Sequence, residues 1–194
     1  MNLGGIIELR KPHLTPNSML IISFFSGVAL WTFLEYVLHR FLGHEHKGKN
    51  FFKDEHQMHH RKVHYFAPVY KKMLAATTVA ISLTVVLSFV VAWHLSVAFI
   101  IGLMGMYGLY EYVHTRYHRK GPVAKIFIVL RKHHFYHHFH QPKLNHGVTT
   151  RFWDRVFGTF HRVETVKVPR KMTMEWLMNG DEIAPAYARH FQLR

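Results

Sequence analysis

Two long runs without a formally charged side chain dominate this 194-residue sequence. The first extends from Ser18 to Leu34, and the second from Met73 to Tyr110. A helix needs roughly 20 apolar residues to cross a bilayer, so the first run predicts one transmembrane helix and the second, about twice as long, predicts two. We place the turn between these two near Trp93, His94 and Ser96, because Trp is common at membrane interfaces and Ser can cap a helix. The expected fold class is all-α, an integral membrane helical bundle.

The charges between these runs predict an orientation. Residues 39–72 contain eight Lys or Arg side chains and three acidic ones, and the positive-inside rule places such a segment in the cytoplasm. The third helix returns the chain to that side. Three crossings put the N-terminus outside; the alternative is a re-entrant first segment with the N-terminus inside, which Arg10 and Lys11 favour. We expect one membrane-embedded domain over 1–194, with helices at about 18–38, 73–92 and 96–113, cytoplasmic segments 39–72 and 114–160, and a C-terminal tail at 161–194 that covers the site.

Charge and cysteine content narrow the class of protein. A net charge of +14 can indicate nucleic-acid binding, but basic segments that flank apolar runs are typical of loops beside a membrane. We therefore expect no nucleic-acid partner. The sequence has no cysteine, so imidazole and carboxylate groups are the ligands available to any metal.

The histidines are concentrated in two patches. Of the nineteen in the chain, seven lie within 39–64 and eight within 114–146. Each patch contains the spacing HxxHH, and on a helix positions i, i+3 and i+4 share one face. In the first patch, Asn50 or Asp54 can cap such a helix. Three imidazoles on one face are typical of a metal site, and two copies of the motif strengthen that interpretation. The motifs are His56, His59 and His60, and His134, His137 and His138.

Two further pairs lie at predicted helix ends. His39 and His44 are five residues apart, and His114 and His118 are four apart. With the two triplets they make ten imidazoles, and because one metal rarely takes more than six ligands, ten predict two metals with about five each. Imidazole suits iron, zinc, copper and nickel alike, so the spacing does not name the metal. Five nearby histidines are expected outside the ligand set, with His64 and His133 the first candidates to replace a member: His46, His64, His133, His140 and His146.

Other residues suggest supporting roles. Gly27, in the middle of the first helix, permits close contact with another helix. Glu35 precedes His39 by one turn and can hold a ligand histidine through its second nitrogen; pairing with Arg40 is the alternative. Asp154 can likewise orient a ligand histidine or simply cap a helix. Trp153 and Asn145 are weaker candidates for closing the site and facing the substrate.

At this point the motifs resemble a known family. HRFLGH, HQMHH, HTRYH and HFYHH, followed by GVTTRFWDRVFGT, are similar to the boxes of the fatty acid hydroxylase and sterol desaturase superfamily of integral membrane oxygenases. The first box and the ending are most similar to fatty-acid and sphingolipid 2-hydroxylases, and the likeness extends from about Glu35 to Thr159. The resemblance assigns the metal ligands to His39, His44, His56, His59, His60, His114, His118, His134, His137 and His138.

The resemblance also implies a reaction. Family members hold two non-haem iron ions at the cytoplasmic membrane face, use O2 as co-substrate, and take electrons from a partner such as cytochrome b5 or a ferredoxin with its reductase. No cytochrome b5-like domain precedes the first helix, so we expect a separate electron donor. The expected function is hydroxylation of a C–H bond in a lipid, a fatty acyl chain or a sphingolipid, with no catalytic residue beyond the metal ligands.

Alternatives remain within and outside the superfamily. Desaturation shares the first hydrogen abstraction with hydroxylation, and sterols, carotenoids or alkyl-ether lipids are other substrates. A metal transporter is the alternative from another class, but transporters tend to place ionisable groups at mid-membrane, whereas these histidines gather at helix ends. A zinc protease is disfavoured because the sequence contains no HExxH motif.

Overall fold

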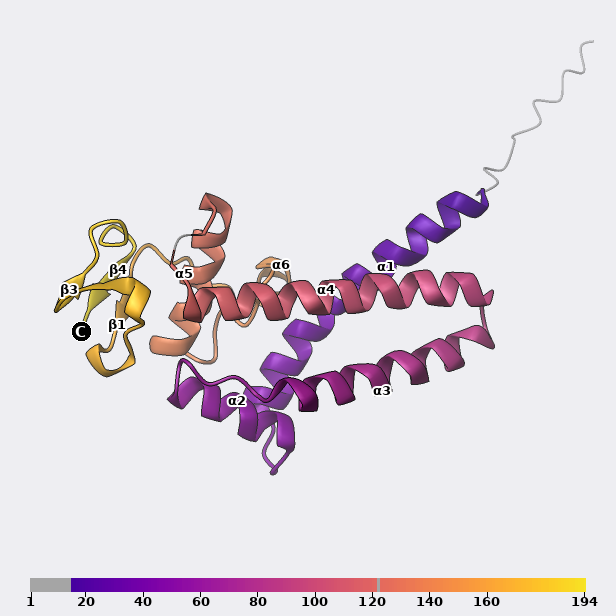
Figure 1. Cartoon of the computed structure of the whole chain (residues 1–194), viewed down its shortest axis with the longest axis horizontal. Coiled ribbons are helices and arrows are strands. Elements are labelled where there is room, and N and C mark those ends of the chain that lie inside the picture. Colours follow the sequence, from indigo (N-terminus) through magenta and orange to yellow (C-terminus); the bar gives the residue numbers. More distant parts are fainter. Residues whose placement is uncertain (1–14, 122) are drawn as a thin grey trace, which may run out of the picture.

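Three long helices form the body of the molecule (Figure 1). The computed structural model describes residues 15–121 and 123–194. Within these residues, three helices are long and apolar enough to span a membrane. They are α1 (Pro16–Val37), α3 (Val69–Ser88) and α4 (Trp93–Arg119).

The outer faces of these helices are apolar. Ile21, Ile81 and Ile101 are 58%, 61% and 57% exposed. Exposed apolar side chains of this kind are expected on helices that face the lipid of a membrane. Helix α3 contributes no buried residue at all. The expectation of a membrane-embedded helical bundle is therefore confirmed.

Helices α1 and α4 cross at a pair of glycines. A Cβ atom on Gly27 would lie 2.0 Å from the backbone oxygen of Phe99, and one on Gly102 would lie 2.0 Å from that of Phe24. The two backbones thus touch reciprocally, as small residues permit in membrane helices. Close contact at Gly27 is confirmed, and Gly102 is its partner.

The turn between α3 and α4 differs from the prediction. Helix α3 ends at Ser88 and α4 begins at Trp93, four residues after an exposed Phe89. Ala92 occupies the cap position without a side-chain hydrogen bond, and Ser96 is buried inside α4. The predicted Ser96 cap was wrong, because the turn comes earlier and Ser96 is already the fourth residue of α4.

The histidine-rich segments gather at the opposite end of the long helices from that turn (Figure 1). A π-helix, η1 (Leu38–Glu45), continues directly from α1. Helix α2 (Phe51–Arg61) follows, and Asn50 caps it by accepting a hydrogen bond from the backbone N–H of Lys53 at 2.8 Å. Helix α5 (Lys125–Phe139) follows α4. Both histidine patches therefore lie at one end of the bundle.

Arg131 of α5 fastens that helix to the end of α4. Its buried guanidinium donates hydrogen bonds to the carbonyls of Arg116, Lys120 and Gly121 at 2.6–2.9 Å. These carbonyls lie at the C-terminus of α4, where a helix lacks internal partners and attracts positive charge. The ring of Trp176 covers the guanidinium at 4.1 Å.

The C-terminal segment adds a small layer beside α5. A short helix, α6 (Phe152–Val156), precedes β1 (Val166–Val168), which pairs in parallel with β4 (Phe191–Leu193). Two short 3-10 helices, η2 (Arg170–Met172) and η3 (Glu175–Leu177), and a hairpin, β2 (Met178–Asn179) with β3 (Glu182–Ile183), complete it.

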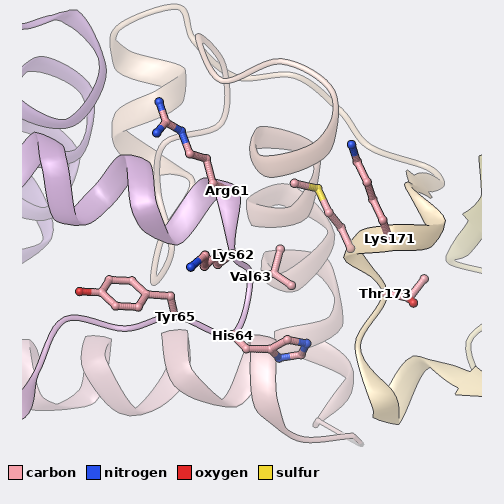
Figure 2. A pocket seen from close by; sticks show the side chains of 8 residues that line it. Arg61, Lys62, Val63, His64, Tyr65, Lys171 and Thr173 are labelled. Carbon is pink, nitrogen blue, oxygen red and sulfur yellow. The ribbon is translucent and has the colours of Figure 1, made fainter.

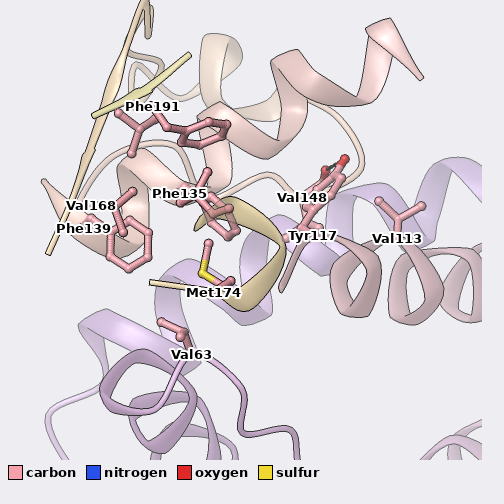
Figure 3. Close-up of a cluster of buried hydrophobic side chains, with 11 residues drawn as sticks. Val63, Val113, Tyr117, Phe135, Phe139, Val148, Val168, Met174 and Phe191 are labelled. Atoms are coloured by element: carbon pink, nitrogen blue, oxygen red, sulfur yellow. Dashed lines mark hydrogen bonds between the residues drawn. The ribbon is translucent and has the colours of Figure 1, made fainter. Parts of the chain in front are cut away.

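Buried side chains join this layer to the helices in one apolar cluster (Figure 3). Phe135 and Phe139 of α5 meet Val168 and Phe191 of the strands, with Met174 between the layer and the helices. The strands were not predicted, but they are few, and the fold class stays helical.

Candidate metal centre

All ten histidines predicted as ligands come together in two groups of five. In each group, one nitrogen from every ring lies within 4.8 Å of the others. We call them group A and group B. Group A contains His39, His44, His56, His60 and His137, and group B contains His59, His114, His118, His134 and His138.

Helices α2 and α5 contribute to both groups. On α2, His56 and His60 face group A and His59 faces group B. On α5, His137 faces group A while the other two members of its triplet face group B. Each HxxHH motif therefore divides its ligands between two neighbouring sites, which places the two groups side by side. The rings of His60 and His138 stack across the boundary, with centroids 4.1 Å apart.

The π-helix η1 explains the five-residue spacing of His39 and His44. In an α-helix, residues five apart point in different directions, but a π-helix closes i to i+5 and brings them to one side. Their ring centroids are 5.4 Å apart. Spacing alone offered no reason for this pair; the reason is the local change of helix type.

The separations within the groups fit a bound ion. The Nε2 atoms of His39 and His60 lie 2.9 and 3.1 Å from Nε2 of His137. In group B, Nε2 of His118 lies 2.9 Å from Nε2 of His134. Two nitrogens bound at a right angle to one ion, with bonds of roughly 2.1 Å, would lie roughly 3.0 Å apart.

Several rings of groups A and B are held by backbone carbonyls. The Nδ1 atom of His39 contacts the carbonyl oxygen of His146 at 2.5 Å, that of His59 contacts Tyr65 at 2.7 Å, and that of His137 contacts Leu144 at 2.9 Å. A carbonyl can only accept, so each Nδ1 carries the proton and each Nε2 is left as the free ligand atom. This arrangement is usual around a metal site.

Buried nitrogens without a partner give a second test of fit. In the described residues, the Nε2 atoms of His59, His114 and His138 are buried and make no hydrogen bond to protein. A buried polar atom without a partner is costly. All three belong to group B, and an ion bound there would satisfy them together. The donor set, ten imidazoles, also suits a transition metal.

Burial keeps these rings neutral. It lowers the pKa of His59 to about 4, and it holds the pKa of His56, His134 and His137 well below the usual range; repulsion between neighbouring rings, were both protonated, acts in the same direction. Neutral imidazole is the form that binds metal, so the protein presents its ligands ready for an ion at neutral pH.

Glu35 does not have either of its predicted roles. Its buried carboxylate accepts hydrogen bonds from the backbone N–H groups of Val148 and Thr149 at 2.5 and 3.0 Å, and from the Thr149 hydroxyl. Arg40 instead pairs with Glu45 at 2.7 Å. Both expectations for Glu35 were wrong, because its partners come from a loop that is distant in sequence.

Asp154 also holds this loop, residues 146–149, through backbone N–H groups that Glu35 does not contact. Its Oδ1 accepts from the backbone N–H of His146 at 2.8 Å, and its Oδ2 accepts from Gly147 N–H and from Nε2 of His133, each at 2.9 Å. Burial alone would raise the pKa of Asp154, but hydrogen bonds led by that from His133 outweigh it and lower the pKa. Asp154 is therefore an ionised acceptor that places the His146 carbonyl against His39 of group A.

The other residues of the loop have structural roles. Gly147 cannot be replaced easily, since a Cβ there would lie 1.9 Å from the Thr150 oxygen. Asn145 adopts a positive φ of 60° and its side chain accepts from the backbone of His161 at 2.7 Å. Trp153 donates to the Thr32 hydroxyl at 3.1 Å and so contacts α1. Asn145 is thus engaged with the backbone of the C-terminal segment.

The remaining histidines of the two patches lie outside groups A and B. His133 is buried and donates to Asp154, His140 accepts from the backbone of Lys167 at 2.9 Å, and His146 is buried beside group A. His46 and His64 are exposed. Phe66, which the sequence did not single out, packs against His59 with centroids 4.8 Å apart.

A basic surface pocket lies beside α2 (Figure 2). It has a volume of about 490 Å³ and is lined by residues 61–65 and 171–173. Arg61, Lys62, His64 and Lys171 line it, and it borders the helix that carries ligands of both groups.

The fold and site define an integral membrane helical protein with two adjacent groups of five histidines that could each hold a metal ion. The family model described as fatty acid hydroxylase matches residues 24–159, and this chain belongs to that family. The histidine groups all fall within the matched region.

Relatives agree with this assignment. The chain is 30% identical to a dihydroceramide fatty acyl 2-hydroxylase of Arabidopsis thaliana, over 79% of this chain and 65% of the relative. It is 32% identical to fatty acid 2-hydroxylase of Mus musculus, over 74% of this chain and 41% of the relative. The chain thus spans less than two thirds of the length of these relatives.

A solved structure shows the same fold. The structure of full-length Scs7p, in which only the hydroxylase domain is visible, superposes with a TM-score of 0.56 and 25% identity. The match covers 73% of this chain and 56% of that one. The predicted resemblance to fatty-acid 2-hydroxylases is confirmed.

Proposed function

We propose that this protein is a membrane-bound, non-haem di-iron oxygenase that hydroxylates a C–H bond of a lipid, either a fatty acyl chain or a sphingolipid. The observation that carries the proposal is the pair of adjacent five-histidine groups at one end of three apolar helices. Its relatives by name act on fatty acids, dihydroceramide and ceramide. We further propose that 1–194 acts as one membrane-embedded domain.

The ten histidines of groups A and B would hold two iron ions, which would supply the reduction and activation of O2. The chain itself supplies the rest. The carbonyls of Tyr65, Leu144 and His146 hold ligand rings in one tautomer, and Glu35 and Asp154 keep the 146–149 loop in place. Four of the five group B histidines are buried and group A is at least half-buried, which limits the access of water and protects a strongly oxidising site from side reactions.

The proposal includes a separate electron donor, such as a cytochrome b5-like protein or a ferredoxin with its reductase. The basic pocket beside α2 supports it, because three cationic side chains there, Arg61, Lys62 and Lys171, would attract an acidic protein surface next to the histidine-bearing helix. The bias of positive charge in 39–72 supports a cytoplasmic location for this end of the molecule.

The direct test is oxidation of lipid with labelled O2. Iron-loaded protein in lipid vesicles, supplied with a ferredoxin and its reductase, is expected to incorporate ¹⁸O into a lipid, measured by mass spectrometry. His137→Ala is expected to abolish incorporation and lower bound iron, whereas His46→Ala, an exposed histidine outside both groups, is expected to retain both. Equal turnover in wild type and His137→Ala would reject the assignment.

A further inference from the structure

A groove runs between α3 and α4. It has a volume of about 790 Å³ and draws its lining from both helices. Along most of its length the lining is apolar or small, including Met73, Ala76, Ala80, Met104 and Gly108. Gly108 leaves open space, since a Cβ there would meet nothing within 4 Å.

The end of the groove near the histidines is strongly basic. Four cationic side chains line it, Lys72, Arg116, Arg119 and Lys120, against one acidic side chain, Glu111. Lys72 pairs with Glu111 at 2.5 Å, so the local charge remains positive. A groove that is apolar along the helices and basic at one end matches a lipid with an apolar chain and a negatively charged head.

The basic end of the groove adjoins group B. The guanidinium of Arg119 lies 4.9 Å from the ring of Phe66. That ring in turn packs against His59 and His114, with centroids 4.8 and 5.2 Å apart. Lys72 is also close enough that its charge contributes, after burial, to lowering the pKa of His59. One aromatic ring therefore separates the groove from two histidines of group B.

We propose that this groove binds one lipid molecule with an anionic headgroup, its chain along the apolar part and its headgroup oxygens at Lys72, Arg119 and Lys120. The carbon atoms nearest the headgroup then lie nearest Phe66 and group B. If the proposed function holds, oxidation falls near the polar end of the chain. An anionic head distinguishes this ligand from the ceramides that name several relatives.

The test measures binding without requiring oxidation. Protein in mixed micelles with equal amounts of phosphatidic acid, phosphatidylcholine and ceramide of the same chain length is examined by native mass spectrometry. We expect one retained phosphatidic acid per chain. Equal retention of phosphatidylcholine or ceramide would overturn the anionic assignment.

Two pairs of variants locate the ligand. Gly108→Leu fills the groove and is expected to reduce bound phosphatidic acid by at least about tenfold, because several methylene contacts are lost. Gly105→Leu is the matched control, since Gly105 also has open space but does not line the groove. Leu favours a helix more than Gly does, so both variants should fold. Similar binding in the two variants would overturn the location.

Lys120→Gln is expected to reduce the preference for phosphatidic acid over phosphatidylcholine about fivefold, the effect of one basic charge near a lipid surface. Lys125 is an exposed lysine outside the groove, so Lys125→Gln should leave this preference unchanged. The same preference in both variants would count against the headgroup site.

The experiments distinguish failure of the lipid-binding proposal from failure of the proposed function. Binding of phosphatidic acid without ¹⁸O incorporation supports the groove and rejects the reaction, whereas ¹⁸O incorporation together with equal phosphatidic acid binding in Gly108→Leu and Gly105→Leu supports the reaction and rejects the groove.

Discussion

At the scale of single residues, burial decides the protonation of the site. An exposed histidine has a pKa of about 6.5, whereas buried His59 has a pKa of about 4. Between these values an unfolded chain binds a proton that the folded chain does not, so acidification favours unfolding. Above pH 6.5 both states are neutral at this residue, and its contribution no longer depends on pH.

Metal-free protein should therefore lose stability as the pH falls from 6.5 to 4. His59 alone is expected to account for about 3 kcal/mol across this interval, and the other buried rings add to it. Thermal unfolding of chelator-treated protein at a series of pH values checks this. His59→Gln should flatten the slope, with exposed His46→Gln as the control. Identical slopes in wild type and His59→Gln would contradict the expectation.

Asp154 allows a second prediction at this scale. Asp154→Asn replaces one of two accepting oxygens by a donor, so contacts from His133 and Gly147 or from His146 and Thr159 are lost. We expect about 2–3 kcal/mol of destabilisation and a 10–100-fold weaker metal site, a loss on the order found for supporting residues. Thermal unfolding and metal titration measure both effects. Asp181→Asn, at an exposed position, should change neither; an unchanged metal affinity in Asp154→Asn would remove its positioning role.

Spacing was a good guide to which histidines gather and a poor guide to their supports. Histidines at i, i+3 and i+4 share a helix face whatever the rest of the chain does, so the six of the HxxHH motifs could be selected before the fold was known; the His39 and His44 pair rested on the family resemblance. The partner of Glu35 is more than a hundred residues away, and the partners of His39 and His137 are backbone carbonyls. Neither kind of contact leaves a pattern in sequence.

At the scale of elements, the crossing of α1 and α4 sets the frame that carries the site. Gly27→Ala would place a methyl group against the Phe99 carbonyl, and we expect about 1–3 kcal/mol of destabilisation from this overpacking. Gly105→Ala, where the space is open, should be neutral or slightly stabilising. Thermal unfolding in detergent compares the two. Equal stability of both variants would show that the helices do not pack as closely as described.

The long helices were predictable because uncharged runs of this length have few other structures available. Their boundaries were less so. The end of α3 and the start of α4 depend on local turn geometry at 89–92, which a uniformly apolar stretch does not specify. The π-helix η1 depends on how the end of α1 meets α2 and the 146–149 loop, so only the five-residue spacing of His39 and His44 hinted at it.

At the scale of the whole molecule, the two helices that carry the HxxHH motifs, α2 and α5, each contribute histidines to both groups. Because α2 and α5 each face both groups, group A is complete only when η1 brings His39 and His44 to this end of the bundle, and group B only when α4 brings His114 and His118 there. The C-terminal layer supports α5 through Phe135, Phe139 and Trp176. Its strands could not be predicted, since strands of two or three residues carry no recognisable alternation.

The most direct test of the central claim is the number of metal ions per chain. Elemental analysis of iron-loaded protein is expected to give about two ions, one for each five-histidine group. The double variant His114→Ala/His118→Ala removes two ligands from group B alone and should retain about one ion. One ion in the wild type, or an unchanged metal content in the double variant, would contradict the two-site account.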